Sequence, residues 1–201
     1  MEYLKSLDRT WFLALNGLNT PWLDPIMLIM SQIWFWIPLY LFLLYLIFKK
    51  YKGSGWTLFI GIGITLLFAD QITSGFMKPY FARLRPSQDP ALMGLVHLVQ
   101  GYKGGLYGFA SGHAANTFGI ALFIFLQFKN DFRFSWVIFI WASLMTYTRI
   151  YLGVHYPGDI IAGGLIGLTS AMLGHFVAKK LHRKIYPTDR EGQPLFPANN
   201  R

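Results

Sequence analysis

Long apolar runs alternate with short polar segments along the chain. Five of these runs approach or exceed the ~20 residues that a helix needs to cross the ~30 Å hydrocarbon core of a bilayer. They cover residues 26–48, 56–77, 111–128, 134–150 and 157–177. The pattern predicts an all-α fold: a polytopic membrane helical bundle with about five spans.

The segments outside these runs have different characters. Residues 3–18 mix charged side chains with Leu, Trp and Phe and are too short and too charged to cross. We therefore expect an N-terminal interfacial helix. Residues 79–110 form the longest stretch between spans and are rich in proline, glycine and arginine, which predicts an outer loop region that caps one face. Pro79 disfavours helix at Lys78, so this lysine is expected at the exit of the second span.

Composition excludes an ordinary soluble domain, because 54% of the residues are apolar, 13% are charged and the mean hydropathy is +0.38. The net charge of +9 comes from short basic clusters between apolar runs, which indicates topology signals and anionic lipid rather than nucleic acid. The absence of cysteine excludes disulfides and thiol catalysis. The first residues lack the features of a cleaved signal peptide, so we expect the spans themselves to direct insertion.

The basic residues are divided unevenly between the two predicted sides, eleven against seven. The first group is Lys49, Lys50, Lys52, Lys129, Arg133, Lys179, Lys180, Arg183, Lys184, Arg190 and Arg201, and the second is Lys5, Arg9, Lys78, Arg83, Arg85, Lys103 and Arg149. By the positive-inside rule the first side is cytoplasmic. We expect a multi-pass protein of the bacterial inner (cytoplasmic) membrane with its polar motifs facing the periplasm. One domain is expected over residues 1–184, followed by a disordered cytoplasmic tail at 185–201.

Three basic residues lie at the predicted outer ends of spans. Lys78, Arg85 and Arg149 offer fixed positive charge and bidentate donors, which suit a phosphoryl group. The alternative is that they are snorkelling anchors at helix ends. The role of Arg83 is left open: it could contact a second phosphate or a headgroup, or it could be exposed to solvent.

A serine, a glycine and a histidine open the third span. Ser111 is a good N-cap, and the free amides of the first helical turn, which includes Gly112, are suited to phosphate oxygens. His113 would then be the general acid that protonates the leaving oxygen. The alternative is a structural cap with an incidental histidine.

A second histidine precedes the last span. His155 stands before Pro157, which suits a first helical turn, and Asp159 follows within that turn. A His–Asp couple of this kind can hold the ring in one tautomer while its other nitrogen attacks phosphorus. The alternative is an interfacial histidine beside a helix-capping aspartate.

Metal binding is the competing chemistry. His113, His155 and Asp159 could supply three ligands, but the nearby cations would repel a divalent ion and already supply its charge. We therefore expect no metal and no cofactor. Asp70, in the second span, is expected to be buried and to pair with a cation.

The motifs Lys-x6-Arg-Pro (Lys78 to Pro86), Ser-Gly-His (Ser111 to His113) and Arg-x5-His-x3-Asp (Arg149 to Asp159) resemble the signature of the type-2 phosphatidic acid phosphatase superfamily. The resemblance implies a metal-independent membrane phosphatase with a phosphohistidine on His155, Asp159 as its orienting partner and His113 as general acid. It also implies a phosphate cradle of Lys78, Arg85, Ser111, Gly112 and Arg149. Two departures are Ala110, where the family usually has proline, and Thr148, where it usually has serine.

The small bacterial members that the chain resembles act at the outer face on lipid phosphates. Our first expectation for the substrate is undecaprenyl pyrophosphate, with lipid A 1-phosphate second and phosphatidylglycerophosphate or phosphatidic acid as further candidates. A lipid phosphotransferase and an anion transporter remain alternatives. The expected partners are the lipid substrate and the bilayer, and the sequence indicates no protein partner.

Overall fold

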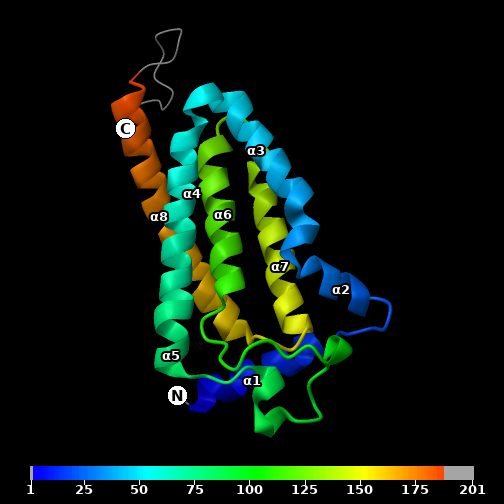
Figure 1. The fold of residues 1–201 in the computed structure, drawn as a ribbon. Coiled ribbons are helices and arrows are strands. Elements are labelled where there is room, and N and C mark those ends of the chain that lie inside the picture. The colour runs from blue at the N-terminus through cyan, green and yellow to red at the C-terminus, as the bar shows by residue number, and fades with distance from the viewer. Residues whose placement is uncertain (1, 188–201) are drawn as a thin grey trace.

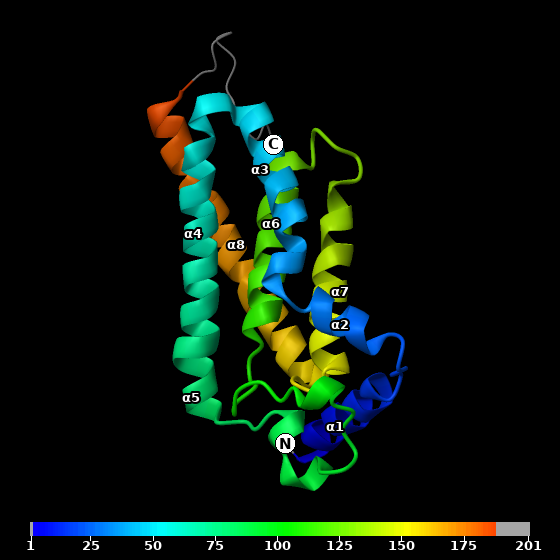
Figure 2. The same ribbon diagram turned by 45° about the vertical axis from the view of Figure 1, so that its right-hand side comes forward.

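A computed structural model of the protein describes residues 2–187. Its longest apolar helices stand side by side along the long axis of the molecule (Figures 1 and 2). They are α3 (Ile37–Tyr51), α4 (Trp56–Asp70), α6 (Gly112–Phe128), α7 (Ile138–Tyr151) and α8 (Pro157–Ile185). Within the described residues the only β-type pairing is an isolated bridge between Leu84 and Tyr107. The predicted all-α class is confirmed.

Helices α3 and α4 are the two arms of a hairpin. They are joined by a short 3-10 segment, η2 (Lys52–Gly55), at whose start Lys52 takes a positive φ of 49°. Two segments of the described chain have the length and hydropathy of a membrane span, Ile33–Phe81 and Pro157–Ile185, and the first contains both arms of this hairpin. Gly112–Phe128 is apolar but shorter.

The predicted first span, residues 26–48, is not one helix. Helix α2 (Asp24–Met30) projects to the side of the bundle, and the chain turns at Gln32, whose backbone is extended (φ −86°, ψ 139°). A 3-10 turn, η1 (Ile33–Trp36), then leads into α3, where Pro38 occupies the first turn. A proline in that position starts a helix rather than kinking one. The prediction of one continuous span was wrong, because a short polar break within an apolar run ends the helix but leaves the average hydropathy of the run high.

The second predicted span ends later than the sequence indicated. Helix α4 continues as a π-helical segment, η3 (Gln71–Met77), and then as α5 (Lys78–Phe81). The helix ends at Ala82, which has a left-handed conformation with φ 43°. The expected absence of helix at Lys78 is therefore wrong. The π-helical turn changes the hydrogen-bond register before Pro79 and so accommodates a residue without an N–H.

Glycines on α8 bring its backbone into contact with the neighbouring helices. A Cβ atom on Gly163 would lie 2.3 Å from the carbonyl oxygen of Ser111, and one on Gly167 would lie 2.1 Å from that of Ala115. Small residues at such crossings allow close helix packing in a membrane bundle. The amide of Ser111 also donates to the carbonyl of Asp159 at 3.0 Å. The starts of α6 and α8 are therefore fixed to each other.

Helix α1 (Glu2–Asn16) and the loop between α5 and α6 lie across one end of the bundle, beside the start of α8 (Figure 1). One face of α1 carries Phe12 and Asn16, which are buried, and the other carries Tyr3 and Trp11, which are exposed. The loop contains the 3-10 turns η4 (Pro86–Gln88), η5 (Pro90–Leu92) and η6 (Val99–Gly101), and a further turn, η7 (Ser135–Val137), precedes α7. The expected helix and capping loop are both present, and α1 is docked on the bundle.

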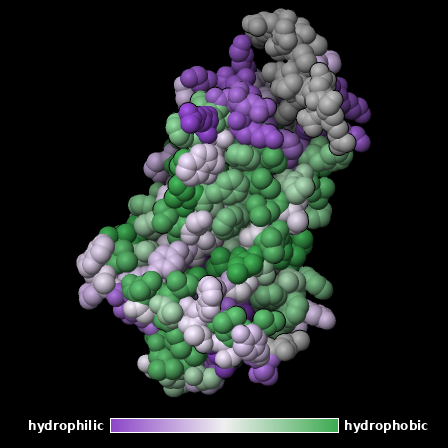
Figure 3. Space-filling view, turned by 180° about the vertical axis from the view of Figure 1, so that it is seen from behind, coloured by the Kyte–Doolittle hydropathy of each residue, from purple (hydrophilic) through white to green (hydrophobic). Residues whose placement is uncertain are grey.

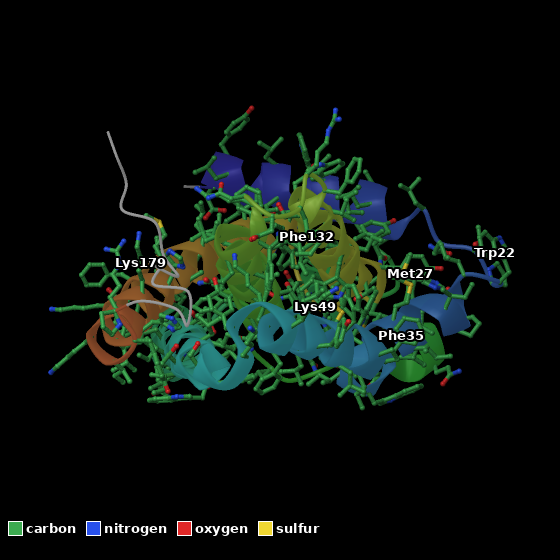
Figure 4. All side chains as sticks on the ribbon, turned by 90° about the horizontal axis from the view of Figure 1, so that it is seen from above. Trp22, Met27, Phe35, Lys49, Phe132 and Lys179 are labelled. Carbon is green, nitrogen blue, oxygen red and sulfur yellow. The ribbon has the colours of Figure 1, made fainter. Side chains whose placement is uncertain are left out.

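The opposite end of the bundle is basic, and the flanks between the ends are apolar. Hydrophilic side chains gather at that end in Figure 3, above a hydrophobic middle. Figure 4 looks onto this end and labels Lys49 of α3 and Lys179 of α8. Helix α8 continues to Ile185, eight residues beyond the expected end at 177, and its 29 residues span about 44 Å. The disordered tail was expected from residue 185, which is wrong for Ile185 because it still belongs to α8, and the part of the expected tail from 188 onward lies outside the described residues.

Candidate active site

The predicted site residues come from several elements that meet at the α1 end of the bundle. Lys78 begins α5, Arg149 lies in the last turn of α7, and Asp159 lies in the first turn of α8. Arg85 and His155 lie in the loops that precede α6 and α8. Segments far apart in the sequence therefore bring their polar side chains to one place.

His155 lies at the centre of these contacts and is 1% exposed. Its amide donates to the carbonyl of Arg149 at 3.2 Å, which fixes the loop against the end of α7. The ring Nδ1 lies 3.3 Å from Oδ2 of Asp159, and the ring Nε2 lies 3.4 Å from Nη1 of Arg85. With Nδ1–H donating to the carboxylate, the lone pair of Nε2 faces Arg85.

The surroundings of His155 determine its protonation. Burial disfavours the charged ring, and the nearby positive charges of Arg85 and Arg149 oppose a further one. Together they hold the pKa of His155 well below its ordinary value of 6.5. The ring is therefore neutral at neutral pH, and Nε2 is free to act as a nucleophile or a base.

Asp159 is fully buried, and its two oxygens have different partners. Oδ2 accepts from the amide of Tyr156 at 3.0 Å, as a capping residue of α8 does, and also faces His155. Oδ1 accepts from Nη1 of Arg83 at 2.9 Å. The role of Arg83 was open in the sequence, and the structure places it against this carboxylate.

Arg83 is held from a second direction by a residue that the sequence analysis did not single out. Its Nη2 donates to Oδ2 of Asp8 in α1 at 2.6 Å. Asp8 lies four residues before Phe12 and eight before Asn16, so it shares the buried face of α1. The sequence did contain a signal for Asp8, because a carboxylate on the buried face of an amphipathic helix needs a partner.

The three predicted phosphate ligands are cations without an acidic partner. Lys78 Nζ donates to Ser74 Oγ at 3.0 Å, and Arg149 Nη2 donates to the hydroxyl of Tyr102 at 3.1 Å. Among residues 2–187, Lys78, Arg85 and Arg149 have no carboxylate oxygen within 4.0 Å. Burial and the charge of Arg149 lower the pKa of Arg85. Uncompensated cations that are partly or fully buried favour an anionic ligand between them.

Glycines in the loop between α5 and α6 let its backbone pass directly over these side chains. A Cβ atom on Gly104, whose φ is +65°, would lie 2.9 Å from Nη1 of Arg85. One on Gly108 would lie 2.9 Å from Oδ2 of Asp159. A side chain at either position would displace the arginine or the carboxylate.

The start of α6 supplies the other predicted residues. Ser111 is fully buried and its hydroxyl accepts from the amide of Ala114 at 3.4 Å, so the predicted N-cap is present. The amides of Gly112 and His113 come before any intrahelical acceptor is available to them. A Cβ atom on Gly112 would lie 3.8 Å from Lys78 Nζ, which places these amides near the cationic group.

The ring of His113 lies at the boundary between the polar group and the apolar bundle. It is within electrostatic range of Arg149 and His155. It also lines a cavity of ≈ 390 Å³ between helices. The other residues that line this cavity are Ile33, Tyr40, Leu66, Asn116, Thr117, Ile120 and Met145. The polar site is therefore continuous with an apolar space.

Two sequence expectations need correction or refinement. Asp70 is exposed on α4 rather than buried, and its carboxylate makes no side-chain hydrogen bond or ion pair with another described residue. Its charge is nevertheless within electrostatic range of Lys78. The hydroxyl of Thr148, one of the two departures from the family pattern, is buried and donates to the carbonyl of Met145 at 2.7 Å. This hydroxyl proton is thus occupied within α7 rather than directed at the cradle.

No group of three His, Cys, Asp or Glu side chains suited to holding a metal ion occurs in the described part of the chain. His113, His155 and Asp159 are thus not arranged as the three-ligand site that the sequence left as a rival. The expected independence of metals and cofactors stays a prediction.

Residues 54–183 match the PAP2 superfamily, a range that covers more than half of the chain and contains all three motifs. The chain belongs to the PAP2 superfamily. The type-2 phosphatidic acid phosphatase superfamily that the motifs resembled is thereby confirmed.

Several relatives extend this result over most of the chain. A lipid A 4'-phosphatase from Porphyromonas gingivalis is 42% identical over 89% of this chain and 75% of that protein. One from Bacteroides thetaiotaomicron is 37% identical over 92% of this chain and 83% of that protein. An undecaprenyl-diphosphatase from Sulfolobus acidocaldarius is 30% identical over 83% of this chain and 72% of that protein.

The fold is also that of a solved member of the group. The crystal structure of Aquifex aeolicus LpxE matches with a TM-score of 0.60 and 26% identity, covering 84% of this chain and 94% of that chain. The predicted enzyme class, a membrane-bound hydrolase that acts on lipid phosphates, is consistent throughout these PAP2 relatives and is confirmed.

Proposed function

We propose that this PAP2 protein removes a phosphate from lipid A, at the 4' position, at the outer face of the membrane and through a phosphohistidine on His155. The observation that carries the proposal is the environment of His155. Its neutral ring is held by Asp159 on one side and presents Nε2 to Arg85 on the other. An anion that neutralises Arg85, Arg149 and Lys78 would place its phosphorus beside that nitrogen.

In the first step Nε2 of His155 attacks phosphorus, an N–P bond forms and the bond from phosphorus to the lipid oxygen breaks. The ring gains positive charge, and Asp159 stabilises it through Nδ1–H. His113 donates a proton to the departing oxygen, which leaves as a neutral alcohol. Lys78, Arg85, Arg149 and the free amides of Gly112 and His113, in the helical turn that Ser111 caps, stabilise the negative charge of the transferring group.

In the second step water attacks the phosphorus of the phosphohistidine. His113, now deprotonated, accepts a proton from the water, the N–P bond breaks and inorganic phosphate leaves. The electron pair of that bond returns to Nε2, which restores the neutral ring. The fixed cations supply the charge that a metal would bring, so we propose that no metal ion is needed.

Lipid A is better supported as the substrate than undecaprenyl pyrophosphate, the first expectation from the sequence. Two relatives named as lipid A 4'-phosphatases share 42% and 37% identity with the chain, and the relative named as an undecaprenyl-diphosphatase shares 30%. Their names also favour the 4' position over the expected 1 position. The apolar cavity beside His113 suits a hydrocarbon chain of either lipid.

The membrane arrangement follows the charge distribution. We propose that α3, the α4–η3–α5 arm, α6, α7 and α8 each cross the bilayer, which gives five spans. The end with Lys49 and Lys179 then faces the cytoplasm, and the site faces the periplasm. Exposed apolar side chains on the flanks, such as Leu41, Leu67 and Leu165, support contact with lipid tails.

A product panel tests the function directly. The purified protein in detergent, with chelator present, is given bisphosphorylated lipid A, lipid A that lacks the 4'-phosphate, undecaprenyl pyrophosphate and phosphatidic acid. Phosphate release and product mass are measured with and without an acceptor lipid. We expect turnover of the bisphosphorylated lipid A and none of the form that lacks the 4'-phosphate.

Other results would contradict parts of the proposal. Faster turnover of undecaprenyl pyrophosphate would return that lipid to first place. A phosphorylated acceptor lipid would identify a phosphotransferase instead of a hydrolase. Activity that disappears with chelator and returns with a divalent ion would contradict metal independence.

A further inference from the structure

Asp159 lies between His155, which needs its negative charge, and Arg83, which neutralises part of that charge. Its Oδ2 faces Nδ1 of His155, where a negative charge stabilises the charged ring of the proposed intermediate. Its Oδ1 receives Nη1 of Arg83 at 2.9 Å. A buried carboxylate needs such a partner, because an unpaired one would take up a proton or destabilise the fold. The same partner also withdraws part of the charge that His155 requires.

Arg83 itself is balanced by a second carboxylate. Its Nη2 donates to Oδ2 of Asp8 at 2.6 Å, while Nη1 binds Asp159. The guanidinium carbon lies 4.0 Å from the centre of the Tyr156 ring, so the planar group is also stacked. Arg83 therefore bridges two acids from different elements with separate nitrogens, which a lysine cannot do with the same geometry.

Asp8 reaches this position from α1, at the other end of the sequence. Its Oδ1 accepts from the amide of Gly158 at 2.7 Å, in the same turn of α8 that carries Asp159. Phe12 packs edge-on against Tyr156 with ring centres 5.4 Å apart, and the side chain of Asn16 donates to the carbonyl of Tyr151 at 2.8 Å. Helix α1 is thus docked on both sides of the loop that carries His155.

We propose that Asp8 and Arg83 are positioning residues: Asp8 holds Arg83 against Asp159 and offsets its charge, so that Asp159 keeps the orientation and charge that His155 needs. Neither residue touches the substrate. The inference rests on the proposed function, since it concerns the His155–Asp159 couple. It assigns to the N-terminal helix a part in the reaction beyond contact with the membrane interface.

Loss of Asp8 should affect the chemical step rather than substrate binding. Without Asp8, the charge of Arg83 is no longer offset and acts fully on Asp159, so the step in which His155 becomes positive slows. Substrate binding depends on Lys78, Arg85 and Arg149, and of these Arg85 contacts the ring of His155 at the edge opposite Asp159. Loss of Asp8 should therefore lower kcat and leave KM nearly unchanged.

Asp8→Asn is the sharpest variant, because its amide oxygen can still accept from Gly158 while its NH2 group cannot accept from Arg83. We expect kcat to fall on the order of 10-fold, the size of coupling within one charge network, with KM changed less than about 2-fold. Arg9→Gln is the matched control. Arg9 lies on the same helix and pairs with Asp89 at 2.9 Å, so its loss weakens α1 docking without touching Asp159.

A double-mutant cycle separates this role from simple docking. If Asp8 acts through Arg83, adding Asp8→Asn to Arg83→Gln should change kcat by less than about 2-fold. Arg83→Lys should recover only part of the kcat that is lost in Arg83→Gln, because one ammonium group cannot bind both carboxylates as the two guanidinium nitrogens do. Thermal unfolding in detergent is measured for every variant, so that loss of fold is recognised as such.

The possible results separate a failure of the positioning role from a failure of the proposed function. An active wild-type protein with equal losses in Asp8→Asn and Arg9→Gln, or with additive losses in the cycle, would overturn the positioning role and leave the function intact. A loss confined to KM would also overturn it. A wild-type protein without phosphatase activity on any lipid of the panel would overturn the proposed function, and this inference with it.

Discussion

Nη1 of Arg85 lies 3.4 Å from Nε2 of His155, at the edge of the imidazole ring that faces away from Asp159. A phosphoryl oxygen bound to this guanidinium would lie next to the lone pair of Nε2, so in the proposed reaction one contact would set both the binding and the direction of attack. The backbone of Gly104 closes the far side of Arg85. The position of Arg85 is therefore the geometric link between recognition and chemistry.

Gly104→Ala should impair the enzyme through Arg85. The added Cβ atom would lie 2.9 Å from Nη1 and 3.3 Å from Cζ of the arginine. We expect kcat/KM to fall by at least about 10-fold, since a misplacement of ~1 Å at a reacting centre has effects of up to about 100-fold. Steady-state kinetics on a lipid phosphate measures it.

Gly101→Ala is the control for this change. Gly101 has a similar positive φ of +70°, but an added Cβ atom there would meet nothing within 4 Å. Both variants share the backbone strain, so the difference between them reports the clash with Arg85. Equal losses of activity would show that strain in the loop, and not the position of Arg85, decides the result.

The pKa of His155 gives a second prediction. Burial and the charges of Arg85 and Arg149 hold it well below 6.5, so the ring should show no protonation step near pH 6.5. Of these charges, that of Arg85 lowers the pKa of His155 most, so Arg85→Gln should raise this pKa. NMR of isotope-labelled histidine rings measures this pKa in the wild type and in Arg85→Gln. The signal of His155 is assigned as the one that is missing in His155→Ala. A wild-type step at or above 6.5 would contradict the neutral nucleophile.

The same shift has a consequence for stability. Below pH 6.5 the unfolded chain binds a proton at this histidine that the folded ring does not take up. The free energy of unfolding should therefore decrease as the pH falls through that value.

The proposed general acid makes a different prediction. His113→Ala removes a proton donor, which matters in proportion to the basicity of the leaving oxygen. On a lipid phosphate, whose leaving group is an alcohol, the loss should be ~10²–10⁴-fold. On p-nitrophenyl phosphate, whose leaving group is a weak base, it should be much smaller. Equal losses on the two substrates would assign His113 another role.

The proposed orientation can be tested because the chain has no cysteine of its own. Single cysteines replace the exposed Lys49, Lys103 and Lys180 in turn. Only the Lys103→Cys protein should react with a membrane-impermeant thiol reagent in intact cells, since this position lies in the outer loop. Labelling of the other two alone would mean that the site faces the cytoplasm.

The sequence predicted the parts of the site that depend on local geometry. Ser111 was recognised as a helix cap, and Asp159 was placed in the first turn of α8, where it binds the amide of Tyr156. Both follow from spacing within a single helical turn. The short distance between Asp159 and His155 follows from the same spacing.

Other features depend on contacts that spacing does not contain. Asp8 and Arg83 are 75 residues apart, and no period in the chain connects them. The turn at Gln32 was missed because a run of apolar residues on both sides keeps the local hydropathy high. Asp70 was expected inside the bundle, since hydropathy identifies a span but does not identify which face of it is covered.

The central claim is that His155 carries the phosphate during the reaction, and rapid-quench trapping tests it most directly. Protein mixed with substrate labelled in the transferred phosphate is denatured within one turnover, and the label on the protein is measured after acid and after base. We predict an acid-labile, base-stable label in the wild type and none in His155→Ala. Label that persists in His155→Ala, or a wild type that turns over without any labelled intermediate, would contradict the account.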